Sequence, residues 1–252
     1  MRTARILTLS IPGSPRSCPP TLVLTAHGSA DPRSAAITHA VAGRIRRLRP
    51  WLDVRPAFLE QTSPALSDVL AQTRDAVVVP FLLADAYHAR VDTPAVIAAS
   101  DCRARQAAVL GEDPALLAVA HQRLAEAGVS PNDDGLGVLV VAVGSSNAAA
   151  NSGTAMVAGM LARNTRWAGA QVAFATGPHP NLDEAAALLR ARGADRLVIS
   201  PWFLAPGRIT DRVLNWAAPQ GIPMAAPLGS HNLVAATVLD RFDAAVAVPA
   251  AA

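Results

Sequence analysis

The 252-residue sequence contains no lysine, so all 22 of its basic residues are arginines, and with 19 acidic residues they give a formal charge of +3. This modest charge argues against nucleic-acid binding, since the only candidate basic run beside an aromatic residue, IRRLRPW (45–51), is typical of an exposed helix end. The two cysteines, Cys18 and Cys102, have no C-x-x-C spacing, so neither a disulfide framework nor a thiolate metal site is expected. No apolar run approaches the roughly 20 residues that a membrane-spanning helix needs. We therefore expect a soluble protein with no membrane partner.

Residues 1–20 are expected to form a flexible tail. They contain two early arginines and a weak apolar hexad, but neither the apolar core nor the A-x-A-like cleavage site of a secretory signal. We therefore expect the tail to stay on the protein and the protein to lie in the cytoplasm.

From Thr21 onward, short apolar runs alternate with longer amphipathic stretches. Strands are expected over 21–26, 53–58 and 76–80, with helices over about 33–48, 63–73 and 114–127. This alternation predicts an α/β fold in which a parallel sheet has helices on both faces. The stretch 128–137, which contains the run Ser-Pro-Asn-Asp-Asp-Gly, is typical of a linker.

The second half of the chain repeats the first. VLVVAVGSS (138–146) matches LVLTAHGSA (22–30), and VISPWFLAPG (198–207) matches VVVPFLLADA (77–86). Collinear matches in the same order predict a duplicated lobe, with the active site in the cleft between the two copies. The expected division is a tail (1–20), an N-terminal lobe (21–128), a linker (129–135), a C-terminal degenerate lobe (136–245) and a second tail (246–252).

Three chemically versatile side chains, His27, Glu60 and His88, each come just after a predicted strand of the first half. Because ligands bind beyond the carboxyl ends of parallel strands, we expect these side chains to meet at one edge of the sheet. The matching positions of the second half hold Val143, Thr176 and Ile209, or Arg208 if one residue is skipped. A structural histidine should survive equally in both halves, so the asymmetric loss favours one chemical site per chain.

Two imidazoles and a carboxylate suit a divalent cation such as iron, cobalt, nickel or zinc, and the imidazoles can also accept protons near neutral pH. Each residue also has a structural explanation. A histidine after a strand is often a hydrogen-bonded turn residue, and Glu60 could offset the dipole of a helix that begins near Ser63. Gly28-Ser29 could be a helix cap or a phosphate site.

Three motifs resemble those of the sirohydrochlorin chelatases, the class II (CbiX/SirB-type) tetrapyrrole chelatases: TAHGSADPR (25–33), AFLE (57–60) followed by Pro64, and VPFLLADAYHARVD (79–92). The resemblance extends over about 21–242 and includes the degenerate second half of two-lobe members. Ala86 departs from the glycine that many relatives have before the Tyr-His pair, and Asp85 is unusual in that loop.

The resemblance implies a two-lobe chelatase fold that inserts a divalent metal into sirohydrochlorin without ATP or another nucleotide, for sirohaem or cobalamin synthesis. Fe²⁺ is favoured as the metal substrate and Co²⁺ is the alternative. His27 and His88 would be metal ligands and proton acceptors, and Glu60 a further metal ligand. The residues expected to contact the tetrapyrrole are Ser29, Tyr87, Arg90, Arg208 and Arg212. A monomer is expected, because the second lobe takes the place of a partner subunit.

Two other readings of the sequence stay open. The chain could be a non-catalytic metal-binding or tetrapyrrole-binding protein of the same fold, since the histidines alone do not distinguish binding from turnover. It could also be a flavodoxin-like nucleotide or phosphate binder that uses Gly28-Ser29, although that reading assigns no task to His88.

Overall fold

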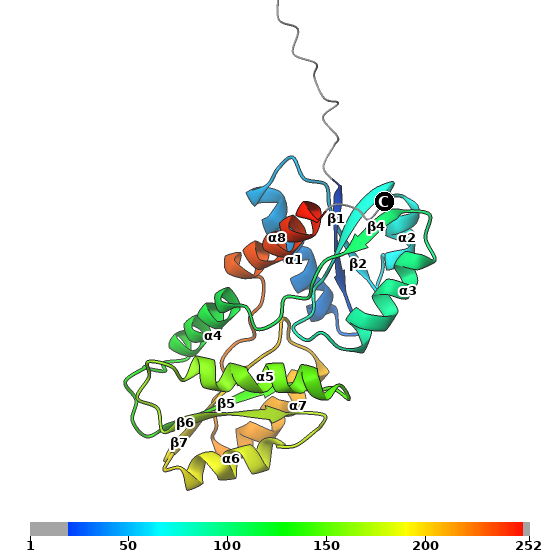
Figure 1. Cartoon of the computed structure of the whole chain (residues 1–252). Helices are drawn as coiled ribbons and strands as arrows, with labels where there is room; N and C mark the ends of the chain where they lie inside the picture. Colours follow the sequence, from blue (N-terminus) through cyan, green and yellow to red (C-terminus); the bar gives the residue numbers. More distant parts are fainter. Residues whose placement is uncertain (1–19, 249–252) are drawn as a thin grey trace, which may run out of the picture.

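The computed structural model describes residues 20–248, which form two α/β lobes, one above the other in Figure 1. The predicted tail 1–20, including Cys18, therefore lies outside the described residues except for its last residue, as do residues 249–252. Among the described residues, no helix is both long and apolar enough to cross a membrane.

The N-terminal lobe is built on a four-stranded parallel sheet in the order β2-β1-β3-β4. Its strands are β1 (Thr21–Ala26), β2 (Val54–Phe58), β3 (Asp75–Pro80) and β4 (Arg103–Gln106), and its helices are α1 (Pro32–Leu48), α2 (Leu66–Ala71) and α3 (Thr93–Ala98). The central strands β1 and β3 are almost wholly buried because helices cover both faces of the sheet. This burial explains why they read as continuous apolar runs.

Two short elements, β4 and α3, were not predicted from the sequence. The strand β4, with the sequence RARQ, pairs only with β3 and has partly exposed side chains, so it carries no apolar run. The helix α3 is a six-residue segment, TPAVIA, too short to show a helical period.

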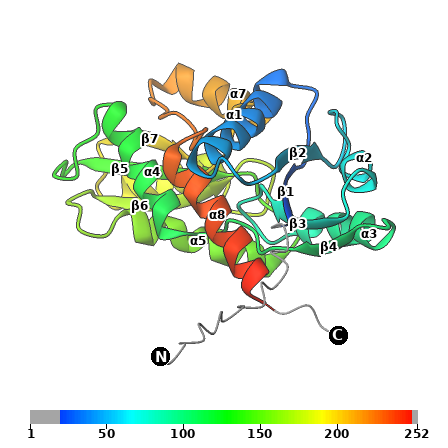
Figure 2. The ribbon, with the colours of Figure 1, turned by 90° about the horizontal axis from the view of Figure 1, so that it is seen from above.

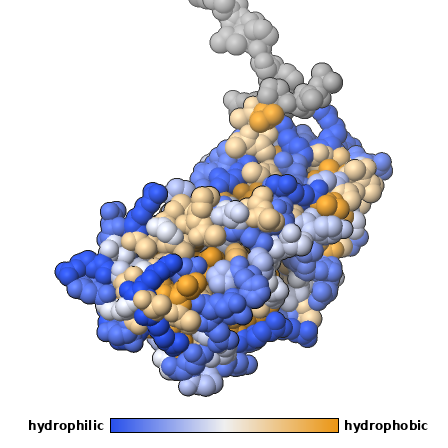
Figure 3. All heavy atoms as spheres, turned by 60° about the horizontal axis from the view of Figure 1, so that its bottom comes forward, coloured by the Kyte–Doolittle hydropathy of each residue, from blue (hydrophilic) through white to orange (hydrophobic). Residues whose placement is uncertain are grey.

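The C-terminal lobe has a three-stranded parallel sheet in the order β6-β5-β7. Its elements are β5 (Leu136–Ala142), α5 (Ala148–Leu161), β6 (Gly169–Phe174), α6 (Leu182–Ala191), β7 (Arg196–Pro201), α7 (Arg208–Ala217) and the 3₁₀ turn η2 (Ala218–Gln220). An isolated bridge between Ile199 and Met224 stands where the first lobe has β4. On the face shown in Figure 3, which the C-terminal lobe dominates, strongly hydrophobic residues are scattered among hydrophilic ones.

Matching backbone contacts confirm the internal duplication. The amide of Glu60 donates to the carbonyl of His27 over 3.0 Å, and the amide of Thr176 donates to the carbonyl of Val143 over the same distance. The Ser63-Pro64 and His179-Pro180 peptide bonds are both cis and occupy equivalent places. His27 and Val143 therefore occupy equivalent positions in the two lobes, as do Glu60 and Thr176, which agrees with the repeat in the sequence.

The last helix of each half packs against the other lobe. The helix α4 (Pro114–Glu126) packs on α5 and β7 of the C-terminal lobe, while α8 (Asn232–Ala247) packs on α1 and β3 of the N-terminal lobe. Figure 2 shows α8 lying across the middle of the molecule. One hydrophobic core consequently includes residues of both sheets, among them Leu22 of β1 and Val138 of β5. The ranges 21–128 and 136–245 thus describe the sequence repeat rather than two separately packed bodies, and α8 continues to Ala247, into the predicted tail 246–252.

Candidate metal-donor site

The structure brings His27, Glu60 and His88 together. His27 follows β1, and His88 begins a π-helical turn, η1 (His88–Asp92), in the loop after β3. The two imidazole centroids lie 4.0 Å apart with their planes at 85°. The Nε2 atom of His27 lies 2.9 Å from Oε1 of Glu60, which follows β2. The carboxyl ends of three neighbouring strands therefore place these side chains as the sequence predicts, while their role as metal ligands stays a prediction.

The other ring nitrogen of each histidine faces an oxygen. Nδ1 of His27 lies 3.0 Å from the carbonyl oxygen of Gly28, and Nδ1 of His88 lies 2.6 Å from Oδ2 of Asp92. Because a carbonyl or carboxylate oxygen accepts, each Nδ1 is placed to donate, and in the neutral form of each imidazole Nε2 then carries the lone pair. Histidines that bind metals show this pattern, in which the second nitrogen is held by a carbonyl or a carboxylate.

The spacing between His27 and Glu60 also suits coordination. Two neighbouring ligands, each about 2.1 Å from one metal ion, lie about 3 Å apart when they subtend a right angle. The observed 2.9 Å between Nε2 and Oε1 matches this separation, and it equally allows a hydrogen bond when Nε2 is protonated. Within residues 20–248, however, no group of three or more His, Cys, Asp or Glu side chains is arranged as a complete metal site.

Asp92 is the residue at this site that the sequence analysis missed. It lies four residues after His88, and the π-helical turn brings its carboxylate to the imidazole. Two side chains hold the turn: the hydroxyl of Thr93 donates to the carbonyl of His88 over 2.8 Å, and the amide of Gln106 donates to the carbonyl of Ala89 over 2.7 Å. The signal available in the sequence was the H-x-x-x-D spacing, since residues four apart share one side of a helical turn.

Gly28 allows the loops after β1 and β2 to touch. Its φ is +95°, a conformation that favours glycine, and a Cβ atom at this position would lie 1.7 Å from the backbone oxygen of Glu60. Glycine is therefore required for His27 and Glu60 to lie so close. This requirement gives Gly28 a backbone role, and the phosphate-binding role considered from the sequence stays a hypothesis.

Two of the residues expected to contact substrate have other partners. The hydroxyl of Ser29 accepts a hydrogen bond from the amide of Asp31 over 3.0 Å and so shapes the turn after His27. The guanidinium of Arg90 pairs with the carboxylate of Asp85 at 2.8 Å, which explains the unusual acidic residue in that loop. Tyr87 is 61% exposed and stands edge-on to the His88 ring, with the centroids 6.1 Å apart.

Arg208 and Arg212 lie on the opposite lobe, on the first turns of α7, and both are exposed. The loop that carries His88 contacts this lobe. The side-chain amide of Asn147, which caps α5, lies 3.4 Å from the carbonyl oxygen of Asp85 in that loop. The site is therefore at the junction of the lobes.

The donor side chains are open to solvent. The side chains of His27, His88 and Glu60 are 37%, 39% and 50% exposed. A hollow of about 770 Å³ lies between α2 and α3 at the amino ends of β3 and β4, and another of about 430 Å³ lies between α1 and α2. Neither is lined by the three donor residues, so the predicted cleft for the substrate stays a prediction.

Comparison with known proteins identifies the family. The model of the CbiX family matches the chain twice, over residues 21–127 and 137–245. The chain belongs to the CbiX family. The two CbiX matches coincide with the two halves of the sequence repeat. No curated protein matches the sequence.

Solved structures share the fold of this CbiX-family chain at low sequence identity. SirB from Bacillus subtilis with Fe³⁺ has a TM-score of 0.77 and 20% identity, over 90% of this chain and 95% of that one. SirB from Bacillus subtilis subspecies spizizenii, a sirohydrochlorin chelatase in complex with cobalt, gives 0.70 and 19%, over 88% and 93%. CbiX, described as the terminal enzyme of sirohaem biosynthesis in denitrifying bacteria, gives 0.66 and 22%, over 91% and 100%. These likenesses establish the two-lobe chelatase fold.

Proposed function

We propose that this protein inserts a divalent metal into sirohydrochlorin without ATP, with Fe²⁺ as the favoured metal and Co²⁺ as the alternative, for sirohaem or cobalamin synthesis. The observation that carries the proposal is the pair of imidazoles, 4.0 Å apart, whose Nδ1 atoms are both held by oxygen acceptors. Membership of the CbiX family supports it. So do the similar structures, which are described with Fe³⁺ and with cobalt.

The proposed reaction replaces two pyrrole protons of the macrocycle by one metal ion. His27 and His88 would hold the cation through Nε2, and once the cation passes to the ring each freed Nε2 lone pair would accept one of the two pyrrole protons. Glu60 offsets part of the cation's charge. Contacts with the periphery of the macrocycle from both lobes would bend the ring toward the metal, so that remote binding energy supplies the distortion. Arg208 and Arg212, at the start of α7, would pair with carboxylates of the tetrapyrrole, because arginine binds carboxylates in a bidentate manner.

The test is an anaerobic insertion assay without nucleotide, followed by absorption spectroscopy of sirohydrochlorin with Fe²⁺, Co²⁺ or Ni²⁺. His27→Ala and His88→Ala should each lower turnover at least about 100-fold, since a positioned proton acceptor contributes that much or more. His179→Ala is the matched control, because His179 is also an exposed histidine paired with a carboxylate, Glu184, but lies in the C-terminal lobe. Undiminished turnover in the double variant of His27 and His88 would refute the proposal.

The same assay separates an enzyme from a binding protein. A protein that binds both the metal and the tetrapyrrole, yet forms no metallated product with any of the three metals, would be the non-catalytic alternative. Competition between Fe²⁺ and Co²⁺ at equal concentration then decides the metal preference. Sedimentation analysis tests the expected monomer.

A further inference from the structure

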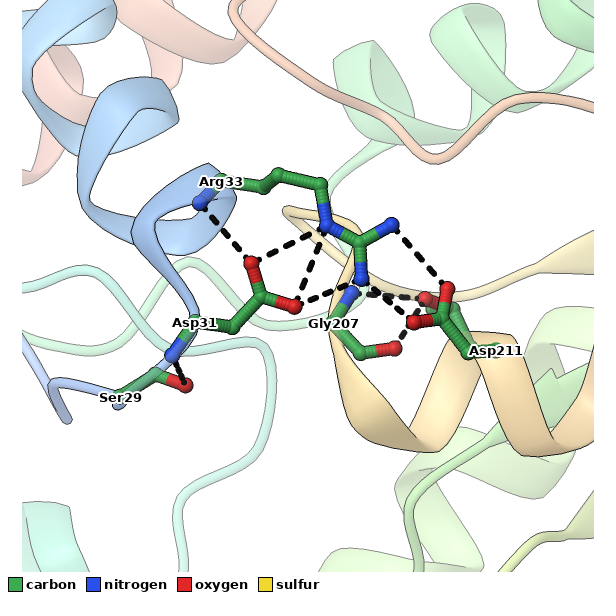
Figure 4. A network of polar contacts seen from close by, with 6 residues as sticks. Ser29, Asp31, Arg33, Gly207 and Asp211 are labelled. Carbon is green, nitrogen blue, oxygen red and sulfur yellow. Dashed lines mark hydrogen bonds and ion pairs between the residues drawn. The ribbon is translucent and has the colours of Figure 1, made fainter.

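A single arginine joins the two lobes beside the donor site. Arg33, near the start of α1, donates from Nη1 and Nη2 to the two carboxylate oxygens of Asp211 on α7, over 3.1 and 2.5 Å. The same guanidinium donates from Nε and Nη2 to the two oxygens of Asp31, over 3.0 and 2.6 Å. Figure 4 shows the guanidinium between the two carboxylates. One planar fork thus binds one carboxylate from each lobe, each through two hydrogen bonds.

On the N-terminal side, Asp31 belongs to the turn that carries His27. Its amide donates to the hydroxyl of Ser29, and its carboxylate caps α1 by accepting from the amide of Arg33 over 3.0 Å. The hydrogen bond from the Arg33 side chain lowers the pKa of Asp31, which keeps this carboxylate ionised. A displacement of Arg33 would therefore shift Asp31 and with it the turn that carries His27.

On the C-terminal side, Asp211 belongs to the rigid first turn of α7. Its amide donates to the carbonyl of Gly207 over 2.9 Å, and the buried hydroxyl of Thr210 accepts from the amide of Gly207 over 2.7 Å. Arg208 and Arg212 flank Asp211 on the same turns and are exposed. The bridge consequently connects the turn of the metal donor with the turn of these two arginines.

We propose that Arg33 is a positioning residue, which fixes the distance between the His27 turn and the arginines of α7 and so sets how tightly the tetrapyrrole is held. This inference rests on the proposed function. Arg33 and Asp211 are 45% and 47% exposed, and ion pairs so exposed add little to folding stability. The loss of the bridge should therefore appear in substrate affinity rather than in unfolding. It should leave the affinity for the metal unchanged, because Arg33 makes no contact with the imidazoles or with Glu60.

The test uses the full chain with Arg33→Lys and Asp211→Asn. Lysine keeps the positive charge but cannot hold two carboxylates with a planar fork. Asp243→Asn is the matched control, because Arg49 near the end of α1 makes an equivalent two-pronged bridge to Asp243 of α8, away from the donor site. KM for sirohydrochlorin, KM for Co²⁺ and kcat are measured for each variant.

We expect KM for sirohydrochlorin to rise about 5–10-fold in Arg33→Lys and Asp211→Asn, while KM for Co²⁺ and kcat stay within about twofold. The double variant should be no worse than either single one, since both remove the same interaction. Hydrogen exchange in segments 27–34 and 207–214 should speed up in both variants. None of these changes is expected in Asp243→Asn.

Three results would each overturn the positioning role. KM for sirohydrochlorin could equal that of Asp243→Asn, it could rise additively in the double variant, or KM for Co²⁺ could rise as much as KM for sirohydrochlorin. Unchanged hydrogen exchange in the two segments would do so as well. An inactive wild-type protein, in contrast, would refute the proposed function itself, which separates the two failures.

Discussion

Replacing Gly28 with alanine should separate the loops that carry His27 and Glu60. The new Cβ atom would lie 1.7 Å from the backbone oxygen of Glu60 and 2.9 Å from its carbonyl carbon, distances at which the backbone must move. The 3.0 Å hydrogen bond from the Glu60 amide to the His27 carbonyl would be lost or lengthened, and with it the 2.9 Å contact between the two side chains.

The C-terminal lobe offers a control that is matched in geometry. Gly144 has a φ of +94°, against +95° for Gly28, and a Cβ atom there would also lie 1.7 Å from a backbone oxygen, that of Gly177. An unfavourable backbone conformation costs about 1–3 kcal/mol, and forced overpacking costs about 1–3 kcal/mol more. Each substitution should therefore lower the free energy of unfolding by about 2–6 kcal/mol, which leaves many domains folded at 25 °C.

Urea unfolding and cobalt titration separate the two effects. Gly28→Ala and Gly144→Ala should shift the urea midpoint by similar amounts. Only Gly28→Ala should also weaken Co²⁺ binding, followed by visible absorption, by about 10-fold or more, since displaced metal ligands lose affinity on that scale. Equal cobalt affinity in the two variants would show that the contact between the loops of His27 and Glu60 does not build the metal site.

Three further predictions concern side-chain substitutions. Asp92→Ala should weaken Co²⁺ binding about 10–100-fold, because His88 loses the carboxylate at 2.6 Å that orients it, and cobalt titration checks this. Burial raises the pKa of Glu112 above 4.5, so its charged form is disfavoured in the folded state and stability should fall as pH rises from about 4.5 through the raised pKa. Glu112→Gln should remove this decline in urea midpoints and stabilise the protein at pH 7. Substituting both Arg208 and Arg212 by alanine should raise KM for sirohydrochlorin and reduce its dependence on salt.

The convergence of the donor residues was predictable because it depends on local signals and one general rule. The apolar runs before His27 and His88 mark central strands, and parallel strands end at the same edge of a sheet. The repeat in the sequence also located the second lobe, since its backbone contacts are copied at Val143 and Thr176.

The features that the sequence did not predict depend on contacts with distant partners or on unusual local geometry. The π-helical turn that brings Asp92 to His88 is held in part by Gln106, on a strand that was itself missed. An amphipathic pattern shows that a helix buries one face, but it does not show which sheet covers that face. The exchange of α4 and α8 between the lobes was therefore not predictable. Arg33 lies within a motif that the sequence analysis singled out, but its partner Asp211 follows far along the chain.

The C-terminal lobe serves as an internal control for the role of the donor residues. At the places of His27 and Glu60 it has Val143 and Thr176, with the same hydrogen bond between their backbones and the same left-handed glycine beside them. The loop therefore folds without an imidazole or a carboxylate at these positions, so folding does not explain their presence in the N-terminal lobe. Nor does a hydrogen-bonded turn explain them, because Thr176 supplies such a bond through its hydroxyl to the carbonyl of Val143 at 2.8 Å. What His27 and Glu60 add is an imidazole nitrogen and a carboxylate oxygen 2.9 Å apart beside a second imidazole, and these are donor types that suit a divalent cation.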